Sequence, residues 1–119
     1  MQVNLDKVPS NLDDAINMIV SSLDDDDKAY IKGHDDVDCH FTVGMSVRNG
    51  WSLWDAETVL VQWFKKTYRI IHADDISGMI LSGVWATVRG EKFDPNKEVK
   101  RYHDHWLKSG INPQTMERI

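Results

Sequence analysis

The chain contains few of the residues that stabilise small secreted proteins or form membrane-spanning segments. Among 119 residues there is one cysteine, Cys39, so neither an intrachain disulfide nor a CxxC metal or redox motif can form. The apolar runs extend over only a few residues, whereas about 20 consecutive apolar residues are needed to span a bilayer. The N-terminus also has no basic region followed by an apolar run. These absences predict a cytoplasmic protein that is neither secreted nor inserted in a membrane.

Proline is scarce as well, and the remaining composition is that of a folded protein. The sequence has 3 prolines, 41% hydrophobic residues and 28% charged residues, which is typical of globular domains. A chain of this length is expected to form one hydrophobic core and to bury roughly two-thirds of its unfolded surface. We therefore expect a single domain over residues 1–119, with a loosely ordered tail from about residue 112.

Positive charge is scarce in the first half of the chain. The net charge is -5, and by residue count the segment 1–60 carries -8 while the segment 61–119 carries +3. Binding of nucleic acid needs a basic surface that releases condensed counterions, and a surplus of three is a small one. The charge distribution argues against a nucleic-acid partner and favours a protein partner. Formation of a homo-oligomer is left open.

Strand-like alternation is absent, and apolar spacing predicts an all-α fold. The clearest stripe runs from Leu12 to Leu23, with Ser10 and Asp13 as its N-cap and capping box. We expect about six short helices in an orthogonal or irregular bundle. The predicted helical segments are approximately 12–23, 26–32, 36–48, 53–66, 73–89 and 95–109. The segment 73–89 is apolar on two faces and is therefore expected to be the central helix.

The segment from Arg48 to Trp54 predicts a tight corner between two helices. Asn49-Gly50 is expected to end the third helix in a left-handed conformation. Ser52 and Asp55 are expected to cap the start of the fourth helix. This interpretation explains most of the segment but gives no structural role to Arg48 and Trp54.

Four residues of this region and of the start of the fifth helix are candidates for ligand or partner binding: Arg48, Trp51, Trp54 and His72. A guanidinium beside two indole rings can stack on them or capture an anion. In the structural alternative, Arg48 bonds the last carbonyls of its own helix or an acid, and both tryptophans enter the core. His72 would then cap the fifth helix, which has acidic residues in its first turn.

An acidic run is the second candidate for partner binding: Asp24, Asp25, Asp26 and Asp27. The run lacks the spaced oxygen ligands and the turn glycine of an EF-hand, so we predict no calcium site. Docking on a basic partner is the functional interpretation. The structural interpretation is a solvated loop whose carboxylates favour the start of a helix.

Two histidine-containing segments include residue types that bind metals or transfer protons. His34, Cys39 and His40 lie close in sequence, but neighbouring residues of a helix point in different directions and do not converge on one metal ion. His103 and His105 flank an aspartate and could act as a general base. No activated nucleophile or phosphate-binding loop accompanies them. We predict no metal and no cofactor, and these observations favour a protein without enzymatic activity while leaving an enzyme as an alternative.

Two blocks of the sequence resemble a family of small uncharacterised bacterial and phage domains. The first is segment 47–54, Val-Arg-Asn-Gly-Trp-Ser-Leu-Trp, and the second is segment 71–77, Ile-His-Ala-Asp-Asp-Ile-Ser. The family pattern has an arginine-asparagine-x-tryptophan-x-leucine-tryptophan block and a later histidine-proline-aspartate-aspartate-x-serine block, in which Ala73 replaces the usual proline. The resemblance covers residues 9–90 and implies a compact helical fold, no assigned activity, and an origin in a phage or another mobile element.

These observations predict a small cytoplasmic protein-binding or regulatory module. By analogy with small acidic phage proteins, its partner would be a host enzyme, such as one of a defence system, which it would inhibit in the bacterial cell. The first alternative is binding or sequestration of a small anion or nucleotide by the arginine, tryptophan and histidine candidates. The second alternative is a metal-dependent or histidine-based hydrolase.

Overall fold

The computed structural model describes residues 7–33 and 47–119. Its helices are α1 (Leu12–Ser22), α2 (Asp25–Gly33), α4 (Val59–Tyr68), α5 (Ala73–Arg89) and α6 (Pro95–Lys108). Residues 47–50 are also helical. These ranges contain no strand, and their only β pairing is an isolated bridge between Ile111 and Arg118. The predicted all-α fold is confirmed.

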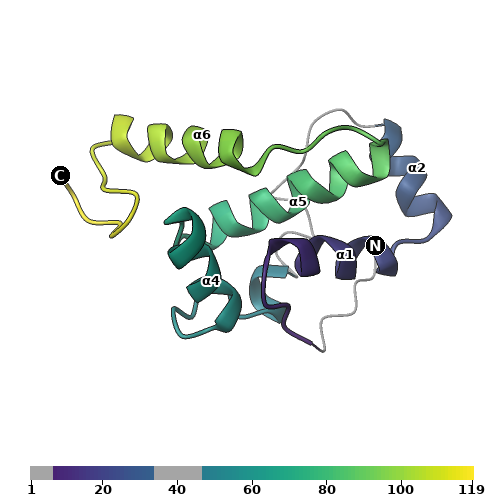
Figure 1. Ribbon diagram of the computed structural model, residues 1–119, viewed down its shortest axis with the longest axis horizontal. Helices are drawn as coiled ribbons and strands as arrows, with labels where there is room; N and C mark the ends of the chain where they lie inside the picture. Colours follow the sequence, from purple (N-terminus) through teal and green to yellow (C-terminus); the bar gives the residue numbers. More distant parts are fainter. Residues whose placement is uncertain (1–6, 34–46) are drawn as a thin grey trace.

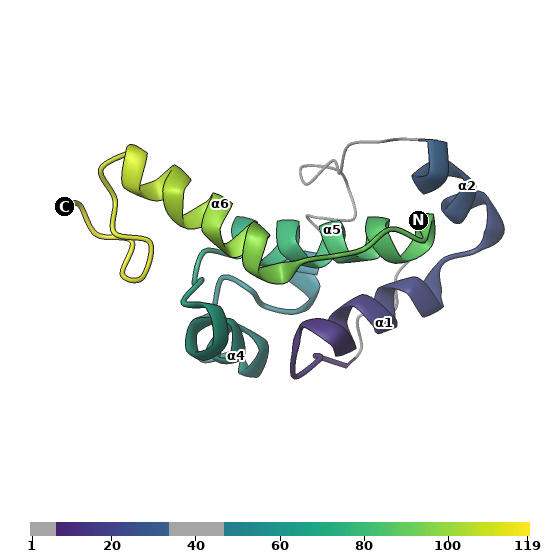
Figure 2. The ribbon, with the colours of Figure 1, turned by 45° about the horizontal axis from the view of Figure 1, so that its top comes forward.

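Helix α5 is the centre of the molecule, as its two apolar faces predict. It packs against α1, α2, α4 and α6. Figure 1 shows α5 between α6 and α1, with α4 towards the start of α5 and α2 beside its end. After a 45° turn, α1 and α6 still lie on opposite sides of α5 (Figure 2). The start and the end of α5 therefore have different surroundings, and only the start is close to the corner that follows Arg48.

Helix α1 packs closely against α5. Its predicted apolar stripe is confirmed, since Leu12, Ala15 and Ile19 are buried. The N-cap prediction was wrong by one residue: Asn11 accepts the bond from the backbone N–H of Asp14 at 2.8 Å. The Ser10 hydroxyl instead donates to the Asp14 carboxylate, and the N-cap position directly before the helix is that of Asn11.

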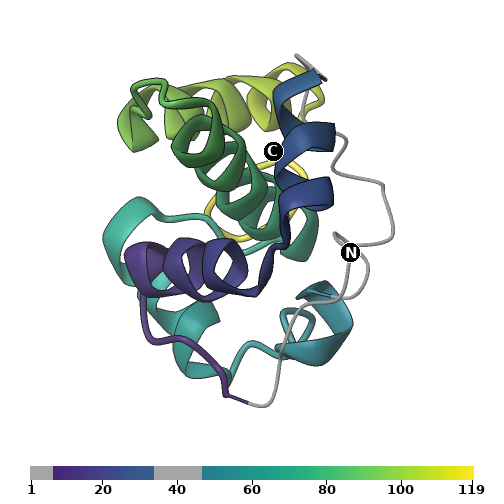
Figure 3. The same cartoon turned by 90° about the vertical axis from the view of Figure 1, so that its right-hand side faces the viewer.

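The acidic run 24–27 has a structural role at the start of helix α2. The backbone N–H of Asp27 donates to Asp24 Oδ1 at 2.8 Å, and the N–H of Asp24 donates to Asp27 Oδ2 at 3.2 Å. This reciprocal pair is a capping box made by two aspartates. At the other end of α2, Arg89 Nη1 donates to the carbonyls of Ile31 and Lys32, which ties α2 to the end of α5. Figure 3 shows the molecule from the right-hand side of Figure 1, with α2 beside the end of α5.

The predicted helix-to-helix corner exists, but its details differ from the prediction. Gly50 is still helical, and it is Ser52 that adopts the left-handed conformation, with φ of 53°. Ser52 therefore does not cap a helix, and two turns follow it before α4 begins at Val59 with Thr58 as N-cap residue. Asp55 Oδ1 accepts from the N–H of Glu57 within these turns. A side-chain-to-backbone bond of this kind stabilises a turn at the expense of a helix.

Helix α6 begins with an N-cap and a proline, and it is less buried than the other helices of the described residues. The Asp94 carboxylate accepts from the N–H of Asn96 at 3.1 Å, and Pro95 opens the helix. No residue of α6 is buried, although Val99 and Tyr102 pack against the core. Leu107, an apolar residue of this helix, is 51% exposed. Helix α6 is therefore attached to one side of the core and is not part of its centre.

Two segments remain, the helix predicted over residues 36–48 and the tail from about residue 112. Most of the helix predicted over residues 36–48, together with the metal-ligand types His34, Cys39 and His40, lies outside the described residues. Following α6, the chain turns back on itself, and the N–H of Ile119 donates to the carbonyl of Gly110 at 3.0 Å. None of the helices in the described ranges has the length and apolarity that crossing a membrane requires.

Candidate functional site

The structure brings three of the predicted binding residues together at the start of α5. Arg48, Trp54 and His72 are linked there through direct contacts or a shared neighbour, Asp74. Trp51 is also close in sequence but is fully buried at 0% exposure. The acidic run 24–27 lies at the start of α2, the helix beside the opposite end of α5 (Figure 1). The two predicted binding regions are therefore separate.

Arg48 joins the corner to the first turn of α5. It is 7% exposed, its Nη1 donates to Ser77 Oγ at 3.0 Å, and its Nε lies 3.4 Å from Asp74 Oδ1. Ser77 Oγ in turn donates to the carbonyl of Asp74 at 3.1 Å. A buried guanidinium needs such partners to compensate for its lost hydration. The structural interpretation of Arg48 as the partner of an acid thus describes its contacts well.

Three aromatic rings form a row across the start of α5. The His72 ring is the middle one, with centroid distances of 5.8 Å to Trp54 and 5.4 Å to Trp106 of α6. His72 is fixed because its Nδ1 accepts from the N–H of Asp74 at 3.1 Å, which confirms its predicted role as the N-cap of α5. Trp54 is 61% exposed. We call Trp54, His72 and Trp106 the aromatic row.

A cavity of about 390 Å³ lies next to the aromatic row, between α5 and α6. It is lined by Arg48, Asp74, Asp75, Arg101, Tyr102, His105 and Trp106. Asp75 is only 8% exposed, and its Oδ2 accepts from Trp106 Nε1 at 2.6 Å. This bond connects α5 to α6 and fixes the indole ring of Trp106 beside the cavity.

Asp75 is a buried carboxyl group whose charge is poorly compensated. Burial raises the pKa of Asp75 above its ordinary value of 3.8, with a smaller contribution from the neighbouring Asp74 carboxylate. The hydrogen bond from Trp106 and the proximity of His72 and His105 lower the pKa, but burial outweighs them. Among the described residues, no lysine or arginine forms an ion pair with Asp75. An acid in such surroundings is a candidate functional group.

We predict that Asp75→Asn stabilises the protein at neutral pH. Because the pKa of Asp75 is raised in the folded state, its stabilising contribution is present below pH 3.8 and is lost as the pH rises through the folded-state pKa. The asparagine carries no charge and keeps an oxygen that accepts from Trp106. Thermal and urea unfolding should give a gain of about 1 kcal/mol at pH 7, the low end of the cost of an uncompensated buried polar group.

The gain from Asp75→Asn should decrease towards pH 3, where the wild-type carboxyl group is protonated. Asp74→Asn is the matched control, because Asp74 occupies the same first turn but lies beside Arg48. That variant should lose stability at neutral pH. A loss of stability in Asp75→Asn at both pH values would contradict the expectation and show that the Asp75 charge is well compensated.

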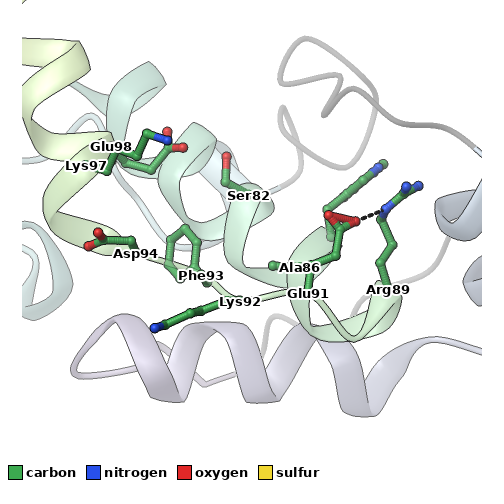
Figure 4. A pocket seen from close by; sticks show the side chains of 10 residues that line it. Ser82, Ala86, Arg89, Glu91, Lys92, Phe93, Asp94, Lys97 and Glu98 are labelled. Carbon is green, nitrogen blue, oxygen red and sulfur yellow. Dashed lines mark hydrogen bonds and ion pairs between the residues drawn. The ribbon is translucent and has the colours of Figure 1, made fainter.

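A second cavity, of about 490 Å³, lies between the last turns of α5 and the first turn of α6 (Figure 4). It is lined by Ser82, Trp85, Ala86, Arg89, Glu91, Lys92, Phe93, Asp94, Lys97 and Glu98. The lining has equal numbers of acidic and basic side chains, and Arg89 forms an ion pair with Glu91. Arg89 also holds α2 in place. With no uncompensated charge in a fixed position, this cavity is a weaker candidate than the one beside Asp75.

The histidines of α6 do not form a metal centre. His103 Nε2 lies 3.2 Å from the carbonyl of Arg69, and His105 lines the cavity beside Asp75. In the described part of the chain, no group of three or more histidine, cysteine or acidic side chains is placed to hold a metal ion. The Asp104 carboxylate between these histidines bonds to Lys100, which lowers the pKa of Asp104. It is therefore not placed as a partner that orients either imidazole.

The fold and the site together define a small all-α domain with an aromatic and acidic cluster at the start of its central helix. Residues 8–88 match a family described as a domain of unknown function, DUF6794, and the chain belongs to this family. No curated protein and no solved structure matches the chain. The matched segment includes the N-cap of α5 and all of this helix except its last residue, and it ends before α6. One wall of the cavity therefore comes from the family segment and the other from outside it.

The sequence interpretation missed Asp75, Tyr102 and Trp106 as site residues. The sequence indicates Asp75 only as one of the acids in the first turn of a helix, and it gives the two aromatic residues only a place in the helix predicted over residues 95–109. The available signal was the pair Tyr102 and Trp106, four residues apart on a helix whose other face is strongly charged. The bond between Asp75 and Trp106 joins residues 31 positions apart, and helical spacing cannot indicate such a pair.

Proposed function

We propose that this chain is a protein-interaction module and that the aromatic row is the centre of its contact surface. The observation that carries the proposal is Trp54, which is 61% exposed yet lies edge-on against the fixed ring of His72. Tryptophan is enriched among the few residues that provide most of the energy of protein interfaces. A side chain already held by a neighbour also loses less conformational entropy when a partner binds.

The surroundings of Arg48 favour a protein partner over a small anion. Its guanidinium already contacts Asp74 and Ser77. The adjoining cavity contains the carboxylate of Asp74 and the buried carboxyl group of Asp75. Both groups disfavour the entry of an anion. In addition, Trp51, one of the rings expected to line a nucleotide site, is buried.

The proposal includes the finer expectations from the sequence. The protein would act in the cytoplasm, and a host enzyme is the proposed partner because the two sequence blocks resemble those of bacterial and phage domains. This step is an analogy with small acidic inhibitors. The exposed carboxylates of Asp25 and Asp26 on α2 would contribute long-range attraction to a basic partner.

The proposal is tested by capturing partners from a lysate of the source cells on the immobilised protein. We expect saturable capture of a defined protein, and Trp54→Ala should weaken the apparent affinity at least about tenfold, as expected for the loss of an interface tryptophan. Val8→Ala is the matched control, because Val8 is a large hydrophobic residue that is 47% exposed outside the aromatic row. The proposal is wrong if no protein is captured saturably or if both variants capture it as well as the wild type.

A further inference from the structure

We propose that the cavity between Asp75 and Trp106 binds the guanidinium group of an arginine side chain presented by the protein partner. The inference rests on the proposed function, because it assigns the chemistry of one partner residue that binds beside the aromatic row. It is carried by a buried acid, an aromatic wall and a nearby cavity of about 390 Å³.

The acid is Asp75, more than nine-tenths buried and part of the cavity lining. Its Oδ2 accepts from Trp106 Nε1 at 2.6 Å. Its Oδ1 has no hydrogen-bond donor among the described residues. A carboxylate removed from water gains most from a cation that both neutralises it and donates to it. The second oxygen is thus available for an incoming N–H donor.

The aromatic wall consists of Tyr102 and Trp106, which follow each other by one helical turn on α6. Such rings attract a cation placed over their faces. The cavity already shows this interaction, since Arg101 Cζ lies 4.9 Å from the centroid of the Tyr102 ring. The surface beside Asp75 therefore has the components that recognise a planar organic cation.

The two arginines that line the cavity do not replace the proposed ligand. Arg48 contacts Asp74 and Ser77, and Arg101 Nη2 lies 2.5 Å from Glu98 Oε2. Each positive charge thus has an acidic partner, whereas the hydrogen bond that Asp75 receives from a described side chain comes from the neutral indole of Trp106. The cavity therefore retains one uncompensated negative charge when Asp75 is ionised.

The chemistry favours arginine over lysine as the occupant. A guanidinium is planar and weakly hydrated, so it stacks on aromatic rings and donates to a carboxylate at a low desolvation cost. A protein partner is favoured as the source because the cavity adjoins the row that ends in the exposed Trp54. An arginine beside a tryptophan contact is a frequent combination at the centre of protein interfaces.

The binding chemistry is tested with N-acetyl-arginine amide and its uncharged counterpart N-acetyl-citrulline amide. The reporter is the indole N–H resonance of Trp106 in ¹H–¹⁵N correlation spectra, assigned with Trp106→Phe. The arginine compound should shift this resonance saturably, and citrulline should not. Asp75→Asn should weaken the apparent affinity at least about tenfold, as expected for the loss of a charge-assisted bond. Val8→Ala, outside the cavity lining and the aromatic row, should bind the arginine compound like the wild type.

The outcomes separate this inference from the proposed function. Equal shifts with citrulline, or unchanged binding in Asp75→Asn, would overturn the guanidinium site even if Trp54 is needed to capture a protein. If the arginine compound binds saturably but no protein is captured, a protein partner is not the source of the guanidinium group. If a partner is captured, Asp75→Asn should weaken its capture as well, and substitution of a single partner arginine by lysine should have a similar effect.

Discussion

Trp51→Ala is expected to lower the free energy of unfolding by about 3–5 kcal/mol, the usual cost of removing a fully buried large aromatic residue. Trp51 is 0% exposed and packs within the core, whereas Trp54, three residues later, is 61% exposed. Trp54→Ala should therefore cost less than about 1 kcal/mol, mainly the loss of its edge contact with His72. Urea unfolding followed by circular dichroism measures both values.

Trp51→Phe is the control that separates packing from hydrogen bonding. Trp51 Nε1 is buried and has no acceptor among the described residues, so phenylalanine loses volume but no hydrogen bond. Its stability should lie between those of the wild type and Trp51→Ala. A Trp54→Ala variant as unstable as Trp51→Ala would show that Trp54 belongs to the core, and the proposed contact surface would lose its support.

Gly83→Ala should destabilise the protein by about 1–3 kcal/mol, the usual cost of overpacking a core, although alanine favours a helix interior. An added Cβ would lie 2.2 Å from Ile16 Cδ1, 2.9 Å from Ile16 Cγ1 and 3.3 Å from Phe93 Cε1. The contacts with Ile16 are too short, so the Ile16 side chain would have to change its conformation or α1 would have to move away from α5. Thermal unfolding of the purified variant measures the loss.

Ile16→Val provides the matched test of this explanation, since it removes the Cδ1 atom that the new Cβ would meet. In the background of Ile16→Val, the substitution Gly83→Ala should cost markedly less than in the wild type. The difference between the two costs is the coupling energy of a double-mutant cycle. Equal costs in both backgrounds would show that the close approach of α1 to α5 is not what requires glycine at position 83.

The helices with complete local signals were predicted correctly from the sequence. Helix α5 has a cap at His72, acids in its first turn and a glycine after Arg89, and its predicted bounds agree with the structure. The corner before α4 was predicted less well. The left-handed residue was expected at Asn49-Gly50 but lies at Ser52. Ser52 adopts a left-handed conformation that serine rarely takes. The burial of its neighbours Trp51 and Leu53 accompanies this conformation, and such a tertiary effect has no signature in the local sequence.

The candidate site could be predicted only in part for a similar reason. Arg48, Trp54 and His72 were singled out because their residue types are unusual in a short segment or at a helix start. Their actual partners lie on other elements: Arg48 contacts Ser77 of α5, and His72 contacts Trp106 of α6. Helical periodicity indicates which face of a helix is apolar but not which residue of another helix it meets.

The attachment of α6 has an evolutionary consequence. The family segment, residues 8–88, contains Asp75, whereas Tyr102 and Trp106 lie beyond it. A relative that keeps this segment but continues with a different sequence would retain the carboxylate and lose the aromatic wall. Under the proposed function, such a change would alter the selectivity for a partner while the core that carries the acid stays constant.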